Sequence, residues 1–494
     1  MSPIVQTIFE QARAGSLWAG HLIPGHAAGT ARIVNTTPID NSTIGHIADG
    51  ARADVDAAVL AARKSFESGE WSRLAPAERK QIMLRWTDLL TEHAEELAAL
   101  DCVDAGKPIS ECLNTDLPAT LDTLRWYAEA IDKCFGRISP TGSDALGLIV
   151  KEAIGVVGVV LPWNFPALMY AWKVGPALAA GNAVIVKPAE LTSLSAYRMT
   201  QLAHEAGIPP GTLTLVTGLG ESAGEPLGRH MDVDMVSFTG STEVGRYFLK
   251  YSAESNLKEI VLECGGKSPQ VIFEDAALDD ILDHVLAAAF WNMSENCSCG
   301  SRLIAHSSIK DALLAKLKDR LGQWKVGLPT DAATHIGPMV ERAHFDKVRS
   351  FMDEAVSEGA RLAHGGRVHS ELGSGWYIEP TIFDDVKPES RLFREEVFGP
   401  ILAVTTFETE EEAIRLANDS AYGLAASLYT LDVRRAQRVA SAIRAGTVSV
   451  NGFSEGDITT PFGGYKQSGF GGRDKGMEAL DQYQQIKTIW YVNS

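Results

Sequence analysis

The chain has 494 residues, of which 45% are hydrophobic and 22% are charged; this composition matches a folded globular protein and excludes a mainly disordered one. Its 63 acidic and 45 basic residues give a net charge of −18. A protein that binds nucleic acid or an anionic membrane needs a basic surface, so we expect neither as a partner. The 45 glycines exceed the usual share and predict many tight turns.

The N-terminal segment has no basic stretch followed by an apolar core, so we predict no signal peptide. The uncharged stretch Ala153–Trp172 is long enough for a membrane span, but Pro162 and Pro166 interrupt it. A buried strand followed by a turn fits this stretch better. The six sparse cysteines favour reduced thiols and a cytoplasmic location. Cys297-Ser298-Cys299 has no second cysteine pair or nearby histidine, so we predict no metal site.

The first part of the chain shows helical periodicity. Val55, Val59 and Ala62 share one face of an amphipathic helix, and Pro76–Leu100 is predicted to form one further helix with proline in its first turn.

From about residue 153, apolar runs rich in β-branched residues alternate with helical patterns, which predicts βαβ units and parallel sheets. A second such series begins near residues 263–268, so we predict two α/β domains in series. Ile486–Val492 is β-prone and is expected to be an edge strand that pairs with another subunit. The predicted strands are Ile154–Leu161, Ala183–Val186, Leu213–Val216, Met235–Phe238, Gln270–Phe273, Ile401–Thr406, Ser427–Thr430 and Thr447–Asn451, and the later helices are Glu410–Asn418 and Val433–Ala445.

Two strand ends carry residues suited to a nucleotide. In the segment from Thr239 to Gly245, glycines at a strand-to-helix turn let backbone N–H groups approach a phosphate, although a purely structural turn explains this segment about as well. Lys187 and Glu190 follow another strand, where open α/β sheets bind ligands. Glu190 can accept hydrogen bonds from both hydroxyls of a ribose; the alternative is a surface ion pair.

Three further residues suit acyl chemistry. Cys297 is a candidate nucleophile, although a single cysteine is more often structural. Glu263 places a carboxylate at the end of an apolar strand, and Asn164 follows another strand as a candidate donor to an oxyanion.

Taken together, these segments resemble the aldehyde dehydrogenase superfamily over nearly the whole chain. The resemblance implies an α/β fold with a Rossmann-like NAD-binding domain (1–134 and 153–262), an α/β catalytic domain (263–474) and a small β oligomerisation arm (135–152 and 475–494). It rests on Pro162-Trp163-Asn164-Phe165-Pro166, Lys187-Pro188-Ala189-Glu190, Phe238-Thr239-Gly240-Ser241, Glu263-Cys264-Gly265-Gly266-Lys267-Ser268, Glu395-Glu396-Val397-Phe398-Gly399-Pro400 and Pro461-Phe462-Gly463-Gly464-Tyr465-Lys466-Gln467-Ser468-Gly469.

The resemblance also implies roles for single residues. Cys297 matches the nucleophile, Glu263 the general base and Asn164 the amide that binds the oxyanion, and Lys173 is a fourth catalytic residue. The cofactor contacts are expected from Trp163, Lys187, Glu190, Gly220, Phe238, Gly240, Ser241, Glu396 and Phe398.

Two positions depart from the family pattern. Ser294-Glu295 stands where Gly-Gln is usual, and Cys264 follows the base in place of Leu or Ala. Glu295 would oppose thiolate formation if its carboxylate pointed towards Cys297, and would have no effect if it pointed away.

The implied reaction is NAD-dependent oxidation of an aldehyde to an acid. The Cys297 thiolate attacks the carbonyl, hydride passes to the nicotinamide, and water activated by Glu263 hydrolyses the thioester. The side chain of Asn164 and the backbone N–H of Cys297 hold the oxyanion, and one such donor is typically worth about 3 kcal/mol. NAD is favoured, with NADP as the alternative, because Glu190 would repel a 2′-phosphate.

The segment Asn451–Asp457 lies where the family places its aldehyde-entry loop, and with the helix 126–133 it resembles the branch acting on γ-glutamylamino- or guanidino-butyraldehydes. We therefore expect an ω-amino, γ-glutamylamino or guanidino aldehyde whose cation meets Glu455 or Asp457; an ordinary solvated loop is the alternative. Aryl, indolyl and simple aliphatic aldehydes remain open as substrates. The residues expected to line the path of the aldehyde are Phe165, Met169, Trp172, Trp291 and Phe462.

Other classes are less well supported. Transfer of the acyl group to CoA would not need the base Glu263, a cysteine hydrolase would need a histidine partner, and a non-catalytic relative would be expected to lose Cys297, Glu263 or Asn164. The expected assembly is a homodimer or a homotetramer.

Overall fold

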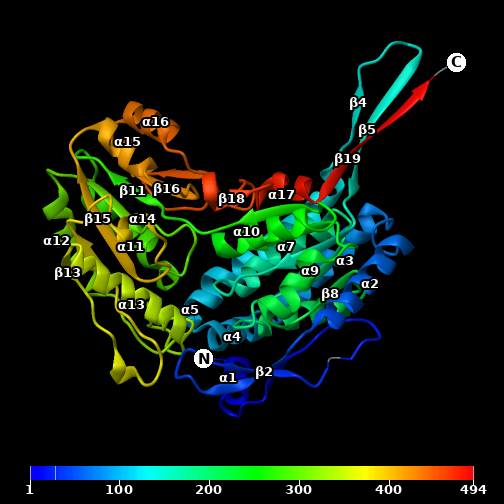
Figure 1. The fold of residues 1–494 in the computed structure, drawn as a ribbon, viewed down its shortest axis with the longest axis horizontal. Coiled ribbons are helices and arrows are strands. Elements are labelled where there is room, and N and C mark those ends of the chain that lie inside the picture. Colours follow the sequence, from blue (N-terminus) through cyan, green and yellow to red (C-terminus); the bar gives the residue numbers. More distant parts are fainter. Residues whose placement is uncertain (1, 28, 493–494) are drawn as a thin grey trace.

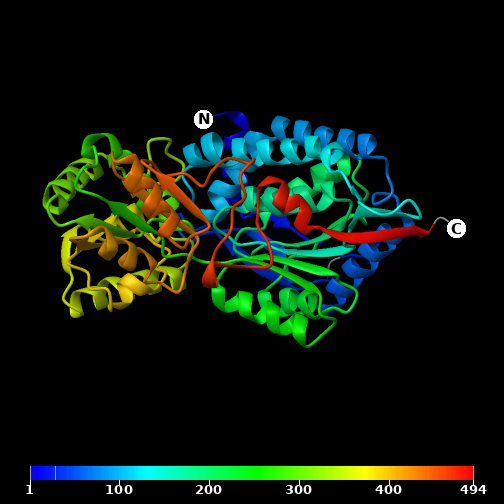
Figure 2. The same ribbon diagram turned by 90° about the horizontal axis from the view of Figure 1, so that it is seen from above.

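The structure is a computed structural model that describes residues 2–27 and 29–492. Two α/β lobes lie side by side, and a narrow β arm that ends near the C-terminus projects from one of them (Figures 1 and 2). A further small sheet near the N-terminus joins β1 (Leu17–Ala19), β3 (Thr43–Ala48) and β2 (Arg32–Thr36).

The first lobe is built on a six-stranded sheet in the order β18-β10-β9-β6-β7-β8. Its strands are parallel except for β18, which runs antiparallel to β10. The central strands are buried along their whole length because helices cover both faces, which explains their unbroken apolar sequence. The strands are β6 (Val156–Val160), β7 (Ala183–Lys187), β8 (Leu213–Leu215), β9 (Met235–Thr239), β10 (Glu259–Glu263) and β18 (Gly469–Phe470).

The second lobe holds a seven-stranded sheet in the order β13-β14-β15-β12-β11-β16-β17, parallel except for the pair β13 and β14. The chain passes from the first sheet to the second between Glu263 and Pro269. The strands are β11 (Pro269–Ile272), β12 (Arg302–His306), β13 (Arg361–His364), β14 (Thr381–Asp384), β15 (Ile401–Phe407), β16 (Ala425–Tyr429) and β17 (Thr447–Val450).

The eight predicted strands are confirmed within a few residues at each end, and so is the helix α15 (Glu410–Asn418). The prediction of one helix over Pro76–Leu100 was wrong. The structure has α3 (Pro76–Glu92) and α4 (Ala94–Ala105), separated at His93, whose φ of −103° and ψ of 13° leave the helical region. The apolar pattern continues across this single residue, so periodicity did not reveal the break.

The helix predicted at Val433–Ala445 ends earlier, because α16 (Val433–Ala442) stops where Ile443 takes an extended conformation. Ala153–Trp172 forms the end of β5 (Ala145–Ala153), the buried strand β6, a turn and the start of α7 (Pro166–Ala179), as the strand-and-turn interpretation expected. Over residues 2–27 and 29–492, no helix is long and apolar enough to cross a membrane.

The arm consists of β4 (Arg137–Ser139), β5 (Ala145–Ala153) and β19 (Gln484–Val492). β19 pairs with β5 from Gln484 opposite Ala153 to Val492 opposite Ala145, and it lies at the edge of its sheet, as predicted. Pairing of β19 with another subunit, and the limits of the three predicted domains, stay predictions.

Candidate active site

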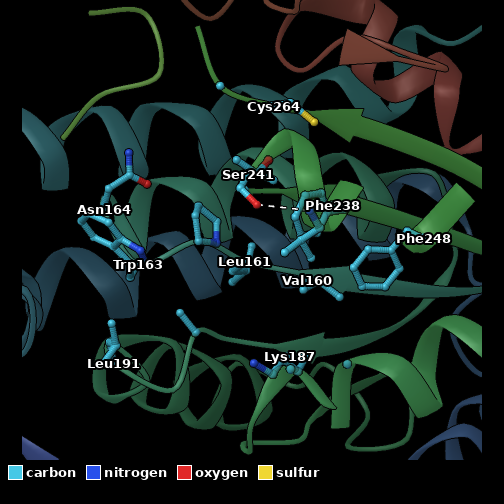
Figure 3. Close-up of a pocket in the computed structure, with 18 of the residues that line it drawn as sticks. Val160, Leu161, Trp163, Asn164, Lys187, Leu191, Phe238, Ser241, Phe248 and Cys264 are labelled. Atoms are coloured by element: carbon cyan, nitrogen blue, oxygen red, sulfur yellow. Dashed lines mark hydrogen bonds between the residues drawn. The ribbon is translucent and has the colours of Figure 1, made fainter. Parts of the chain in front are cut away.

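A cavity of about 720 Å³ lies at the carboxyl ends of β6, β7 and β9. Parallel strands of an open α/β sheet place their ligand sites at this edge. Figure 3 shows Trp163 and Asn164 towards one end of the cavity, Phe248 towards the other, and Lys187 across the cavity from Ser241. The nine predicted cofactor residues all line it: Trp163, Lys187, Glu190, Gly220, Phe238, Gly240, Ser241, Glu396 and Phe398.

Lys187 and Glu190 form an ion pair on the wall of the cavity. Lys187 is the last residue of β7, and its Nζ lies 3.1 Å from Oε2 of Glu190. The Lys187 side chain is buried, whereas that of Glu190 is 36% exposed. Burial, followed by the nearby charge of Glu190, raises the pKa of Glu341. A second carboxylate, that of Glu341, therefore stands near Glu190.

The helix α10 (Thr242–Ala253) begins at the cavity. Ser241 is its N-cap, and the Ser241 Oγ accepts a hydrogen bond from the backbone N–H of Val244 at 3.2 Å (Figure 3). A capped N-terminus with its positive dipole end facing a cavity is a suitable place for a phosphate.

Glu396 and Phe398 line the same cavity together with His344, which the sequence did not single out. Oε1 of Glu396 accepts a hydrogen bond from the backbone N–H of Gly266 at 2.8 Å, and burial raises the pKa of Glu396. A Cβ at Gly265 would lie 2.2 Å from Oε2 of Glu396, and a Cβ at Gly266 would lie 2.3 Å from the carbonyl oxygen of Cys297. The Gly-Gly pair therefore lets the segment after β10 pass between these two groups.

Cys297 lies on the segment between α11 (Leu278–Phe290) and β12, and it lines the cavity together with Asn164. Burial raises the pKa of the Cys297 thiol well above its ordinary value, and the charges of Glu455, Glu396 and Glu263 raise it further. In this arrangement the thiol is protonated near neutral pH. The side-chain amide of Asn164 donates to the carbonyl oxygen of Glu295 at 2.9 Å, which places it beside the cysteine segment.

Glu263 ends β10 and is buried, and within the described residues neither of its carboxylate oxygens has a hydrogen bond of good geometry, although the backbone N–H of Gly464 lies near enough to lower its pKa. Burial raises its pKa well above the ordinary value, the charge of Asp474 raises it further, and Lys173 lowers it. Lys173 is also fully buried and donates to Ser237 Oγ at 3.2 Å and to the carboxylate of Asp474. The structure thus brings Lys173 to Glu263, but outside the wall of the cavity.

The side chain of Glu295 points away from the thiol. Its Oε1 accepts a hydrogen bond from the backbone N–H of Val340 at 3.1 Å and lies 3.6 Å from Nε2 of His344. The acids that chiefly raise the pKa of the Cys297 thiol are Glu455, Glu396 and Glu263. The departure from the family pattern at this position is therefore not a main cause of the raised pKa of the Cys297 thiol.

The residues expected along the path of the aldehyde form two aromatic pairs. Phe165 packs on Trp291 with ring centroids 5.1 Å apart, and Trp172 packs edge-on against Phe462 at 5.3 Å. Met169 lines the 720 Å³ cavity, whereas these four aromatic residues do not.

The two acids of the predicted entry loop differ in their surroundings. The carboxylate of Glu455 accepts a hydrogen bond from the hydroxyl of Ser298, the residue after the nucleophile. Asp457 is exposed, and its carboxylate accepts from the backbone N–H and the hydroxyl of Thr459 at 2.9 and 2.6 Å. The structure therefore brings only Glu455 to the cysteine segment.

Several residues at the site were missed from the sequence. Lys475 donates to the carbonyl oxygens of Glu455 and Gly456 at 2.7 and 3.1 Å, and its Nζ lies over the rings of Trp172 and Phe462 at 5.2 and 5.6 Å. Asp474, Ser298 and His344 were missed as well. A local signal that could have drawn attention to Asp474 and Lys475 is the charged run Arg473-Asp474-Lys475, which follows a recognised motif.

The fold and this arrangement of thiol, amide and carboxylate define a class of enzyme. A family model described as "Aldehyde dehydrogenase family" matches residues 26–489, so the chain belongs to the aldehyde dehydrogenase family. The predicted family, fold class and enzyme class are confirmed.

Individual relatives are similar over almost the whole chain. An aminoacetaldehyde dehydrogenase of Pseudomonas aeruginosa is 54% identical over 465 residues, which cover 94% of this chain and 93% of that protein. An NADP/NAD-dependent aldehyde dehydrogenase of Escherichia coli K12 is 47% identical over 454 residues, 92% of this chain and 91% of that one. Among solved structures, the indole-3-acetaldehyde dehydrogenase of P. syringae, as a Cys-to-Ala mutant in complex with NAD+, has a TM-score of 0.96, 44% identity and 99% coverage of both chains.

Proposed function

We propose that this protein oxidises an aldehyde to a carboxylic acid with NAD through a thioester on Cys297. The observation that carries the proposal is that Cys297 and Asn164 line the same cavity as the nine predicted cofactor residues, with Glu263 buried beside them. The Cys297 thiol loses its proton, its thiolate adds to the aldehyde carbon, and the Asn164 amide and the Cys297 backbone N–H donate to the resulting oxyanion. After hydride leaves the carbon, Glu263 takes a proton from the water that hydrolyses the thioester.

The residues of the cavity fit NAD, which supplies the hydride acceptor. Glu190 would bind the adenosine ribose, the N-terminus of α10 the pyrophosphate and Glu396 the nicotinamide ribose. We propose NAD in preference to NADP, because a 2′-phosphate next to Glu190 and Glu341 would be repelled. Since relatives include an NADP/NAD-dependent enzyme, NADP stays a second cofactor. In Glu190→Gln, kcat/KM for NADP should rise relative to that for NAD; an unchanged ratio would contradict this role.

We propose that the substrate carries a cationic tail: an ω-amino, γ-glutamylamino or guanidino aldehyde. The support is the Glu455 carboxylate beside Ser298, next to the nucleophile, and the similarity to an aminoacetaldehyde dehydrogenase. Asp457 is the weaker candidate, because Thr459 already occupies its carboxylate.

A second candidate is an aryl or indolyl aldehyde. The support is the similarity to an indole-3-acetaldehyde dehydrogenase and the aromatic pairs Phe165 with Trp291 and Trp172 with Phe462, which lie outside the wall of the 720 Å³ cavity. The Lys475 ammonium over Trp172 and Phe462 also disfavours a second cation at those rings.

The experiment follows absorbance at 340 nm with NAD and no CoA, using 4-guanidinobutyraldehyde, indole-3-acetaldehyde and an uncharged aliphatic aldehyde of matched length. We expect Cys297→Ala to abolish NADH formation; full activity in that variant would overturn the reaction. A cationic substrate predicts that Glu455→Gln lowers kcat/KM about tenfold or more for the guanidino aldehyde alone, with Asp457→Asn as the matched control. An equal loss for all three aldehydes would overturn the cationic assignment and leave the reaction standing.

A further inference from the structure

Glu295 occupies an unusual position two residues before the nucleophile. It is only 1% exposed, and its backbone and side chain bind different parts of the site. Its carbonyl oxygen accepts hydrogen bonds from the side-chain amides of Asn164 at 2.9 Å and Asn292 at 3.0 Å. Its carboxyl group reaches in another direction, to the backbone N–H of Val340 and to His344.

The backbone that precedes Glu295 is strained. Asn292, Met293 and Ser294 have φ values of 53°, 56° and 60°, a left-handed run that non-glycine residues rarely adopt. Such conformations persist only where surrounding contacts enforce them. Here Ser294 Oγ donates to the carbonyl of Ala289 at 2.5 Å, and the Glu295 N–H donates to the carbonyl of Asn292 at 2.9 Å. The carboxyl contact to Val340 fixes the far end of this run.

The carboxyl group reaches the wall of the cofactor cavity. His344 lines the cavity, and its Nε2 donates to the carbonyl of Phe398 at 2.7 Å. Phe398 itself has a left-handed φ of 61°. The ring of Trp163 packs edge-on against those of His344 and Phe398, with ring centroids 5.4 and 5.3 Å apart. Trp163 directly precedes Asn164 in the chain, and the two side chains lie next to each other in Figure 3.

We propose that Glu295 is a positioning residue that couples binding of the nicotinamide end of the cofactor to the orientation of Asn164 and Cys297. This inference rests on the proposed function, because it takes Glu396 and Phe398 as the nicotinamide end. A ligand that presses on Phe398 or His344 moves the group that Glu295 contacts. Glu295 passes that shift to the carbonyl that orders the Asn164 amide, two residues from the thiol.

His344 is a suitable partner for this coupling. Its donation to Phe398 requires hydrogen on Nε2, the atom that also faces Glu295. Burial lowers the pKa of His344 to about 4, so the ring is neutral near neutral pH and holds this tautomer. A glutamine at 295 would keep an acceptor for Val340, whereas alanine would remove the contact altogether.

The test compares wild type, Glu295→Ala and Glu295→Gln by the rate at which iodoacetamide modifies Cys297, with and without saturating NAD, followed by mass spectrometry of the Cys297 peptide. We expect NAD to change the wild-type rate about fivefold or more, in line with typical coupling between two sites. In Glu295→Ala the modification rates with and without NAD should differ by less than about twofold, and kcat should drop about tenfold. Glu295→Gln should restore the wild-type effect of NAD and the wild-type kcat. Thermal unfolding of each variant separates this effect from loss of the fold.

The coupling would be overturned if NAD changed the modification rate of Cys297 as much in Glu295→Ala as in wild type. It would also be overturned if NAD did not change that rate in wild type. Neither result would touch the proposed reaction, which fails only if Cys297→Ala still forms NADH.

Discussion

The ammonium of Lys173 lies 3.0 Å from the carboxylate of Asp474, although 301 residues separate the two along the chain. Both side chains are at most 1% exposed, so neither charge has water to stabilise it. Their ion pair stands beside Glu263, whose pKa Asp474 raises and Lys173 lowers. Of the two, Asp474 has the larger influence, so the pair as a whole raises the pKa of Glu263.

Replacing Asp474 with Asn should shift the activity of the enzyme towards lower pH. The variant loses the charge that raises the pKa of Glu263 and leaves Lys173 unopposed, so Glu263 ionises at lower pH. The acid limb of the kcat–pH profile should move to lower pH. The free energy of unfolding should fall by about 3–5 kcal/mol, as is typical when a buried pair loses one partner. The matched control is Asp481→Asn, which breaks the exposed pair with Lys151 at 2.5 Å. It should cost at most about 1 kcal/mol and leave the profile in place.

Glu263→Gln should lose activity and gain stability. Among the described residues, its buried carboxylate has no hydrogen bond of good geometry, a state that typically costs about 1–3 kcal/mol and more for a charged group. The folded-state pKa of Glu263 is raised above that of an unfolded carboxyl, near 4.3. The wild type therefore loses stability as pH rises from about 4 through the folded-state value, and the variant does not.

Urea unfolding at pH 5 and pH 9 measures this difference for Glu263→Gln. Its advantage should be larger at pH 9, and mass spectrometry should detect an accumulated acyl-enzyme after mixing with NAD and an aldehyde. If Glu263→Gln exceeded wild type in free energy of unfolding by the same amount at both pH values, burial of the ionised Glu263 carboxylate would not destabilise the wild type.

Glu455→Gln should make Cys297 more reactive in the free enzyme. After burial, Glu455 is the strongest influence that raises the pKa of the thiol, so removal of its charge favours the thiolate. The pH profile of alkylation should shift to lower pH, and the rate near pH 7.5 should rise about three- to tenfold, since one pKa unit is a tenfold change in thiolate. Asp457→Asn, which alters an exposed acid in the same loop, should leave the profile unchanged; a matching shift there would show that the effect is not specific to Glu455.

Lys107 should matter for catalysis without touching the substrate. Its Nζ donates to the carbonyl of Asn164 at 3.2 Å, lies 2.5 Å from the carboxylate of Asp116 and stands 3.7 Å from the ring centre of Phe165. The double variant Lys107→Met with Asp116→Asn removes both buried charges together and so avoids an uncompensated one. We expect it to fold but to lose about tenfold or more in kcat, because a slightly displaced oxyanion donor is costly, while KM for NAD stays near the wild-type value. Unchanged kcat would show that Asn164 is held without Lys107.

Much of the fold was predictable because the relevant patterns are local. The apolar runs that became β6, β7 and β9 are unbroken because both faces of their sheet are covered, and that signal lies within five residues of sequence. The break at His93 was not predictable in the same way, since one residue leaves the helical region while the apolar pattern runs on.

For the site, the sequence by itself determined which groups were candidates. Cys297, Glu263 and Asn164 each stand in a motif whose residue types suit their chemistry, and the cavity joins two of these residues with the nine cofactor candidates. Only the tertiary structure decided what surrounds them: that Glu295 turns to Val340, and that Glu455 rather than Asp457 reaches Ser298. The physical reason is that ionisation and hydrogen bonding depend on neighbours within a few ångströms, and packing brings those neighbours from distant parts of the chain.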